Sequence, residues 1–210
     1  MNQAAAVLFS DEQELTEFGT KLLAYRLDVL ENDVNRCTDI DPDLMMRSQT
    51  APFSALLYCF ATIDFLGALY AGDASEMRPT TKQSHRYMTD FMQYTNDQTD
   101  LLQQVFRHQI VHLAQPDPSF VRNSDRIAWT TETQHSTDHL KLVKLPKGSS
   151  KYLLTSNYTL EYDYMFFVSI KDLESDIRAS VYKPNGYFDR LQTDLPLRQN
   201  FANAALAIYS

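Results

Sequence analysis

Apolar residues recur at helical spacing after Ser10, which together with Gln13 forms the pattern of an N-terminal capping box. The pattern predicts a first helix that continues to about Glu31. Its apolar stripe contains Leu15, Phe18, Leu22, Leu23, Tyr25, Leu27 and Leu30. The acid-rich stretch from Glu31 to Asp43 is expected to be a solvated connection, with a loop at 39–42.

A second helix is predicted from Pro52, which suits the first turn of a helix, to Gly72, which can adopt the left-handed conformation that closes one. The segment is apolar nearly all round, so we expect it at the centre of a helical bundle. Asp64 interrupts the apolar run and leaves an uncharged stretch shorter than the roughly 20 residues of a membrane span. We therefore interpret the segment as a buried core helix and expect no membrane partner.

Two further helices complete the first half of the chain. Thr80 and Gln83 predict a cap, after which Tyr87, Phe91 and Tyr94 mark a short third helix. The fourth helix is expected from Asp97 until the prolines at 116 and 118 stop it. Its buried stripe consists of Leu102, Val105, Phe106, Ile110 and Leu113.

The second half changes character and predicts short antiparallel strands followed by helices. The expected strands are Ile127–Thr131, His139–Leu145, Lys151–Tyr158 and Tyr164–Ile170, with a turn at 146–149. Ser169 is expected to cap a helix carrying Leu173, Ile177 and Val181; Asn185-Gly186 breaks the chain, and Asn200–Tyr209 is helical. The sequence thus predicts a mainly α fold: a single domain over 1–210, with core helices at about 10–116 and a strand-containing extension at about 120–210.

Composition narrows the classes of function. The chain has 210 residues and a formal net charge of −8, which argues against a broad basic surface for duplex nucleic acid but not against a small basic cleft. Cys37 and Cys59 are too few for a disulfide scaffold and are assigned no role. The first nine residues lack the positive region of a secretory signal, so a cytoplasmic protein is expected.

The segment Arg107-His108-Gln109-Ile110-Val111-His112 carries the most chemistry. Arginine can hold a phosphate through its planar fork of donors, and histidine can transfer a proton near neutral pH. Helical periodicity places Leu101, Val105, His108 and His112 on one face, with Arg107 on a neighbouring face. One helix therefore does not direct Arg107 and His112 to a single point, whereas two apposed copies can. Leu101 and Val105 would suit the interface between those copies.

A long apolar helix, a short aromatic helix and a helix that ends in this motif are followed by a strand-rich segment. This arrangement resembles the HEPN superfamily, whose signature is an arginine, a polar residue, three further residues and a histidine. The resemblance covers about residues 10–116. It implies a metal-independent endoribonuclease without cofactor, acting on RNA as a homodimer with the active site at the interface, in a bacterial toxin or antiviral defence setting. It also implies an antitoxin or another regulatory partner.

The resemblance departs from the family pattern at two positions. Some members carry a tyrosine two residues after the motif histidine, where a partner nucleotidyltransferase modifies it, and here that position is Ala114. Modification of that kind is therefore not expected. The residue after the arginine is often asparagine, whereas here it is His108, which can likewise donate or accept a hydrogen bond.

The mechanism implied by this resemblance assigns each residue a role. His112 would take the proton of the RNA 2′-hydroxyl or protonate the leaving 5′-oxygen, Arg107 would stabilise charge on the phosphate, and His108 would orient His112 or a phosphate oxygen. Asp64 is a candidate to orient Arg107 or His112, because a carboxylate within an apolar helix is costly unless it is paired. The structural alternatives are that Arg107 pairs with an acid, that His112 caps its helix, and that Asp64 bonds a backbone group or lies on the surface.

Two other functions compete with the nuclease. His108 and His112 have helical ligand spacing that His135 and His139 repeat, with Asp138 adjacent, so four converging histidines would suit zinc. A noncatalytic HEPN-like module that binds RNA or protein is the other alternative. The tyrosines at 152, 158, 162 and 164 and Phe166 could then stack on bases, although such residues in strands more often form core or cross-strand pairs.

Overall fold

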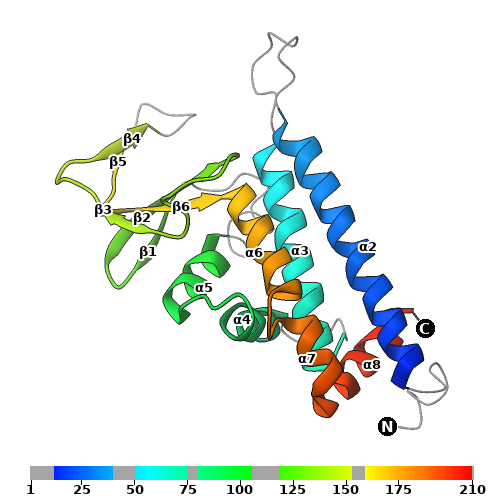
Figure 1. The fold of residues 1–210 in the computed structure, drawn as a ribbon. Coiled ribbons are helices and arrows are strands. Elements are labelled where there is room, and N and C mark those ends of the chain that lie inside the picture. Colours follow the sequence, from blue (N-terminus) through cyan, green and yellow to red (C-terminus); the bar gives the residue numbers. More distant parts are fainter. Residues whose placement is uncertain (1–11, 40–50, 75–79, 106–118, 153–158, 210) are drawn as a thin grey trace.

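The computed structural model describes residues 12–39, 51–74, 80–105, 119–152 and 159–209. Figure 1 shows helices gathered around α3 (Pro52–Ala71), with a small sheet at one end of the bundle. α3 packs against α2 (Glu12–Thr38), α4 (Thr80–Asp90), α6 (Ile170–Tyr182) and α8 (Leu195–Tyr209). The mainly α class and the central position of α3 are therefore confirmed.

The ends of α3 follow their local signals. Pro52 lies in the first turn, and Gly72 has φ 76° and donates its N–H to the Ala68 carbonyl at 3.0 Å. Gly67 is required for a different reason, since an added Cβ would lie 2.8 Å from the Ser84 backbone nitrogen. Within the described residues, α3 is the helix long and apolar enough to cross a membrane, but 56% of its most apolar window is buried in the bundle.

The first helix is longer than predicted. α2 continues seven residues past the expected end at Glu31, because Val34 and Thr38 extend its buried stripe and are fully buried. The Thr38 hydroxyl also donates to the Val34 carbonyl at 2.8 Å. Cys37, which falls in the stretch expected to be a solvated connection, is therefore half-buried within the helix.

The third and fourth predicted helices are positioned by an intervening turn. α4 ends at Asp90 rather than reaching Tyr94, because Gln93 has a left-handed φ of 62° that turns Tyr94 inward. α5 (Asn96–Gln103) begins with a capping box in which Thr95 and Gln98 satisfy each other's backbone N–H groups. Phe91 and Tyr87 stack at 5.2 Å in the aromatic core beneath this turn.

The strands form a mixed sheet, which corrects the expected antiparallel hairpin set. The order is β1-β2-β6-β3, in which β2 (Asp125–Glu132) pairs in parallel with β6 (Tyr164–Ser169). β1 (Ser119–Arg122), which was not predicted, and β3 (Leu142–Lys144) are antiparallel edge strands. β4 (Ser150–Tyr152) and β5 (Thr159–Glu161) form a separate antiparallel pair. On the parallel strands β2 and β6, Ile127, Trp129, Phe166 and Val168 are buried together against the helices.

The C-terminal segment is more helical than predicted. Ser169 caps α6 as expected, its hydroxyl accepting the Asp172 N–H at 3.1 Å. α7 (Tyr187–Thr193) was not predicted. α8 begins five residues before Asn200, because the Asp194 carboxylate accepts the Leu197 N–H at 3.1 Å and starts the helix earlier.

Candidate functional site

The residues of the Arg107–His112 motif lie outside the described part of the chain, so their roles remain proposals. The structure does place the helix that leads to them. Leu101 and Val105 are 1% and 0% exposed and belong to the core of this chain. The predicted use of these two side chains at a dimer interface is therefore wrong, because their own bundle already covers them. Asp64 is half-buried on α3.

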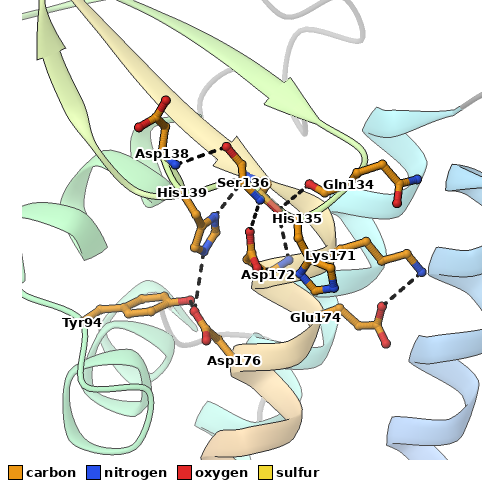
Figure 2. Close-up of polar contacts among 11 residues, drawn as sticks. Tyr94, Gln134, His135, Ser136, Asp138, His139, Lys171, Asp172, Glu174 and Asp176 are labelled. Carbon is orange, nitrogen blue, oxygen red and sulfur yellow. Dashed lines mark hydrogen bonds and ion pairs between the residues drawn. The ribbon is translucent and has the colours of Figure 1, made fainter.

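A polar cluster at the junction of β6 and α6 is the candidate site that the structure brings together (Figure 2). The strand runs directly into the helix, and the loop at 133–141 wraps around the first turn of α6. Ser169 connects the loop to the helix. Its hydroxyl donates to the Gln134 carbonyl at 2.9 Å and accepts from the Asp172 N–H. The cap of the helix and the position of the loop therefore depend on one side chain.

Asp172 makes hydrogen bonds to two neighbouring residues of the loop. Its carboxylate accepts the Ser136 N–H at 2.7 Å and lies 2.7 Å from Nδ1 of His135. Burial acts to raise the pKa of Asp172, but hydrogen bonding with Ser169, His135 and the Ser136 N–H outweighs it and lowers the pKa to about 2. The carboxylate is thus ionised at neutral pH and can only accept hydrogen bonds.

The partner of Asp172 is an imidazole that faces solvent. Because the ionised carboxylate can only accept, Nδ1 of His135 carries the proton of their hydrogen bond, which leaves Nε2 as the basic nitrogen. The His135 side chain is 67% exposed. A carboxylate that fixes the tautomer and orientation of a solvent-facing histidine is an arrangement suited to proton transfer.

His139 occupies the opposite, enclosed half of the cluster, with 11% of its side chain exposed. Its Nδ1 accepts the Ser169 N–H at 3.0 Å, so the neutral ring carries its proton on Nε2. Nε2 lies 3.6 Å from the Asp176 carboxylate, which is close enough for electrostatic attraction but too long for a hydrogen bond. His139 therefore acts as a backbone acceptor that joins the loop to the strand end.

Asp176 also connects the junction to the helix that precedes the motif. The Tyr94 hydroxyl donates to the Asp176 carboxylate at 2.6 Å from the turn before α5. Burial, followed by the neighbouring Asp176 charge, raises the pKa of Tyr94 well above its ordinary value, so the phenol stays protonated as the donor. The Gln98 amide, from the capping box of α5, reaches the Leu140 carbonyl at 3.5 Å. The start of α5 is thus fixed against the same loop.

A second charged pair, Lys171 and Glu174, lies beside Asp172 at the start of α6. Lys171 is 3.6 Å from Glu174 and also hydrogen-bonds Asn35 on α2. Burial raises the pKa of Glu174, and the Glu174 charge in turn adds to the burial that raises the pKa of the Cys59 thiol. Cys59 is fully buried and its thiol stays protonated, which excludes it as a nucleophile.

Four histidines were considered as zinc ligands, and the structure describes two of them, His135 and His139. These two do not converge on one point. His135 is hydrogen-bonded to Asp172, whereas His139 lies 3.6 Å from Asp176, so the two histidines face different carboxylates. Across the described ranges, no group of three or more histidine, cysteine, aspartate or glutamate side chains is arranged to hold a metal ion. Tyr162 and Phe166, considered for base stacking, are 5% and 0% exposed and are core residues.

Sequence reasoning singled out His135, His139 and the Ser169 cap but missed Asp172, Asp176 and Tyr94 as their partners. The spacing of the two carboxylates was a usable signal. Asp172 and Asp176 are four residues apart and therefore share a helix face, and the two histidines of the loop are also four residues apart. Nothing in the pattern connects loop and helix, because they are more than 30 residues apart along the chain.

Comparison with known proteins adds no further assignment. No family model, no curated protein and no solved structure matches this chain.

Proposed function

We propose that this protein is a metal-independent endoribonuclease that cleaves single-stranded RNA and leaves a 2′,3′-cyclic phosphate. In this reaction the 2′-oxygen attacks phosphorus and the bond to the 5′-oxygen breaks. A base removes the proton of the 2′-hydroxyl, and an acid protonates the departing 5′-oxygen. The step therefore requires neither a water molecule nor a metal ion. The observation that carries the proposal is the His135–Asp172 pair, a solvent-facing imidazole with its tautomer fixed by an ionised carboxylate.

The Arg107–His112 segment supplies the rest of the proposed chemistry. Arg107 would stabilise charge on the transferring phosphate, His112 would transfer one of the two protons, and His108 would orient His112 or a phosphate oxygen. Asp64 keeps its proposed role as an orienting carboxylate. The rigid attachment of α5, through the Thr95–Gln98 box and its buried leucines, supports the proposal because a catalytic segment needs a fixed base.

The HEPN assignment, the cytoplasmic location and the toxin or antiviral defence setting belong to the same proposal. They rest on the motif and on the order of the helices before it. An antitoxin or regulatory partner would fit an enzyme whose substrate is cellular RNA. The proposed active site at a homodimer interface would need contacts other than Leu101 and Val105, which lie in the core of this chain.

The direct experiment is cleavage of end-labelled single-stranded RNA by the purified protein in EDTA, beside the Arg107→Ala/His112→Ala double variant. We expect cyclic-phosphate ends from the wild type and none from the double variant, with both proteins giving the same circular dichroism spectrum. Cleavage that persists in the folded double variant would remove the motif from the mechanism. Absence of cleavage by the wild type across varied RNAs would favour the noncatalytic binding module instead.

A further inference from the structure

His139 is the enclosed histidine of the β6–α6 junction, and its ring lies between two hydrogen-bonding groups. Nδ1 accepts the Ser169 backbone N–H at 3.0 Å, whereas Nε2 lies 3.6 Å from Oδ2 of Asp176. The ring therefore joins the loop to the end of β6 on one side and faces the first turns of α6 on the other (Figure 2). Because the ring is rigid, moving Nε2 towards Asp176 moves Nδ1 away from Ser169.

The bond to Ser169 requires a neutral ring. A ring nitrogen accepts a hydrogen bond only while it carries no proton, and both nitrogens of an imidazolium carry one. Protonation of His139 would therefore set two N–H groups against each other beside Ser169, which is fully buried. Imidazole is the side chain whose charge ordinarily changes between about pH 5 and pH 8, so the conflict arises close to neutral pH.

The surroundings of the ring favour a positive charge. Asp172 has its pKa lowered to about 2, so it is ionised throughout this pH range, and the His139 charge is one of the causes of that lowering. Lys141, the nearest cation in the loop, is paired with Asp138 at 3.1 Å. The ionisable groups of the neighbouring elements are Asp172 and Asp176 of α6, Glu132 of β2, the protonated Tyr94 phenol before α5, the protonated Cys59 thiol of α3, and His135, Asp138 and Lys141 of the loop.

We propose that His139 is a pH-sensitive switch between the end of β6 and the Asp176 carboxylate. The neutral ring accepts the Ser169 N–H. The protonated ring releases that group and donates from Nε2 to Asp176, because repulsion by the Ser169 N–H and attraction to the carboxylate move it in the same direction. Acid thus transfers this attachment of the loop from the strand to the helix.

The change is expected to be local. The Leu140 N–H donates to the Phe167 carbonyl at 2.8 Å, and the Ser169 hydroxyl donates to the Gln134 carbonyl, so two bonds without a titratable partner keep the loop in place. Oδ2 of Asp176 already accepts the Tyr94 hydroxyl at 2.6 Å. The protonated ring would share the oxygen that fixes the start of α5, which links the pH to the position of that helix.

Nuclear magnetic resonance of the ¹⁵N-labelled protein between about pH 8 and pH 5 tests the switch. Protection of the Ser169 amide against hydrogen exchange, corrected for the intrinsic rate at each pH, should fall about 10-fold or more. The ¹⁵N shifts of the His139 ring should report protonation of Nδ1 over the same range. The amide of Ile63, which is fully buried in α3, should stay protected, so a local change is distinguished from unfolding.

Three variants separate the groups involved. His139→Asn keeps an acceptor near Nδ1 but does not titrate, so the protection of Ser169 should stay constant across the range. Asp176→Asn still accepts from Tyr94 but has no charge, so the loss of protection should require a more acidic pH. His135→Ala leaves the enclosed ring in place and should behave like wild type.

The switch does not depend on ribonuclease activity, and these measurements report the junction alone. Protection of Ser169 that stays constant in wild type, or a loss that persists in His139→Asn, would overturn the proposal. An unchanged transition in Asp176→Asn would exclude the carboxylate as the second partner of the ring. A parallel loss at Ile63 would show that acid unfolds the protein instead of moving one side chain.

Discussion

The loop at 133–141 carries two histidines, and each lies near a carboxylate of α6. Their surroundings nevertheless differ. His135 is 67% exposed and donates to an ionised carboxylate at 2.7 Å. His139 is 11% exposed, accepts a backbone N–H and lies 3.6 Å from its carboxylate. The first pair leaves a basic nitrogen facing solvent, whereas the second uses its basic nitrogen to satisfy the backbone.

The difference shows that the chemistry open to a histidine–aspartate pair depends on which ring nitrogen is hydrogen-bonded to the carboxylate. When the carboxylate takes the Nδ1 proton, Nε2 can exchange protons with a substrate. When Nδ1 instead accepts from Ser169, protonation would set two N–H groups against each other. We therefore expect His135 to matter for activity and His139 to matter for stability.

The largest expected effect is on catalysis. His135→Ala should reduce RNA cleavage about 10²- to 10⁴-fold, the usual contribution of a general acid or base. Its unfolding free energy should fall by less than about 1 kcal/mol, because the His135 side chain is 67% exposed. The measurement is the single-turnover cleavage rate together with urea unfolding.

A matched control for this variant exists elsewhere on the surface. His85 lies 3.3 Å from Asp100, with 29% of its side chain exposed, and it is outside the junction. His85→Ala should cleave RNA at the wild-type rate. Equal cleavage rates for wild type and His135→Ala would show that the His135–Asp172 pair only holds the loop in position and takes no part in the reaction.

His139→Ala should give the next largest effect, a loss of about 2–3 kcal/mol in unfolding free energy. The change leaves the Ser169 N–H without its acceptor in a buried position and removes a packed ring. Urea denaturation monitored by circular dichroism measures the loss. His139→Asn keeps an acceptor near Nδ1 and should recover part of the stability; if Asn and Ala are equally destabilising, the backbone bond is not the cause.

The smallest of the three effects appears in the pH dependence of stability. Folding lowers the pKa of Asp172 from 3.8 to about 2, so its contribution is complete above about pH 4 and is lost as the pH falls towards 2. That shift corresponds to about 2 kcal/mol. Wild type should lose this much more than Asp172→Asn when urea unfolding is followed from about pH 5 to pH 2. Parallel curves would contradict the ionised pair.

Local signals in the sequence located several element ends. Pro52 and Gly72 bound α3, and Ser169 caps α6, because each acts through backbone groups within a few residues. The same reasoning failed where a local signal was weak or overlooked. α2 extends past Glu31 through Val34, and α8 starts early at the Asp194 cap.

The sheet shows why pairing is harder to predict than the strands themselves. Ile127–Thr131 and Tyr164–Ile170 were predicted as strands, and both lie within or next to observed ones. Their parallel pairing, Ile127 with Tyr164, joins residues 37 positions apart. Alternation along each strand identifies a buried face but carries no information on the direction or identity of its neighbour.

The sequence by itself determined the helical class, the central apolar helix and the Ser169 cap, and it singled out His135 and His139 without their partners. Tertiary structure decided which of those residues meet. It tied His135 to Asp172, buried His139, and covered Leu101 and Val105 with the chain's own core while leaving Leu57 and Tyr58 exposed. The physical reason is that periodicity reports an apolar face, whereas only packing determines whether that face is covered by the same chain or left for another.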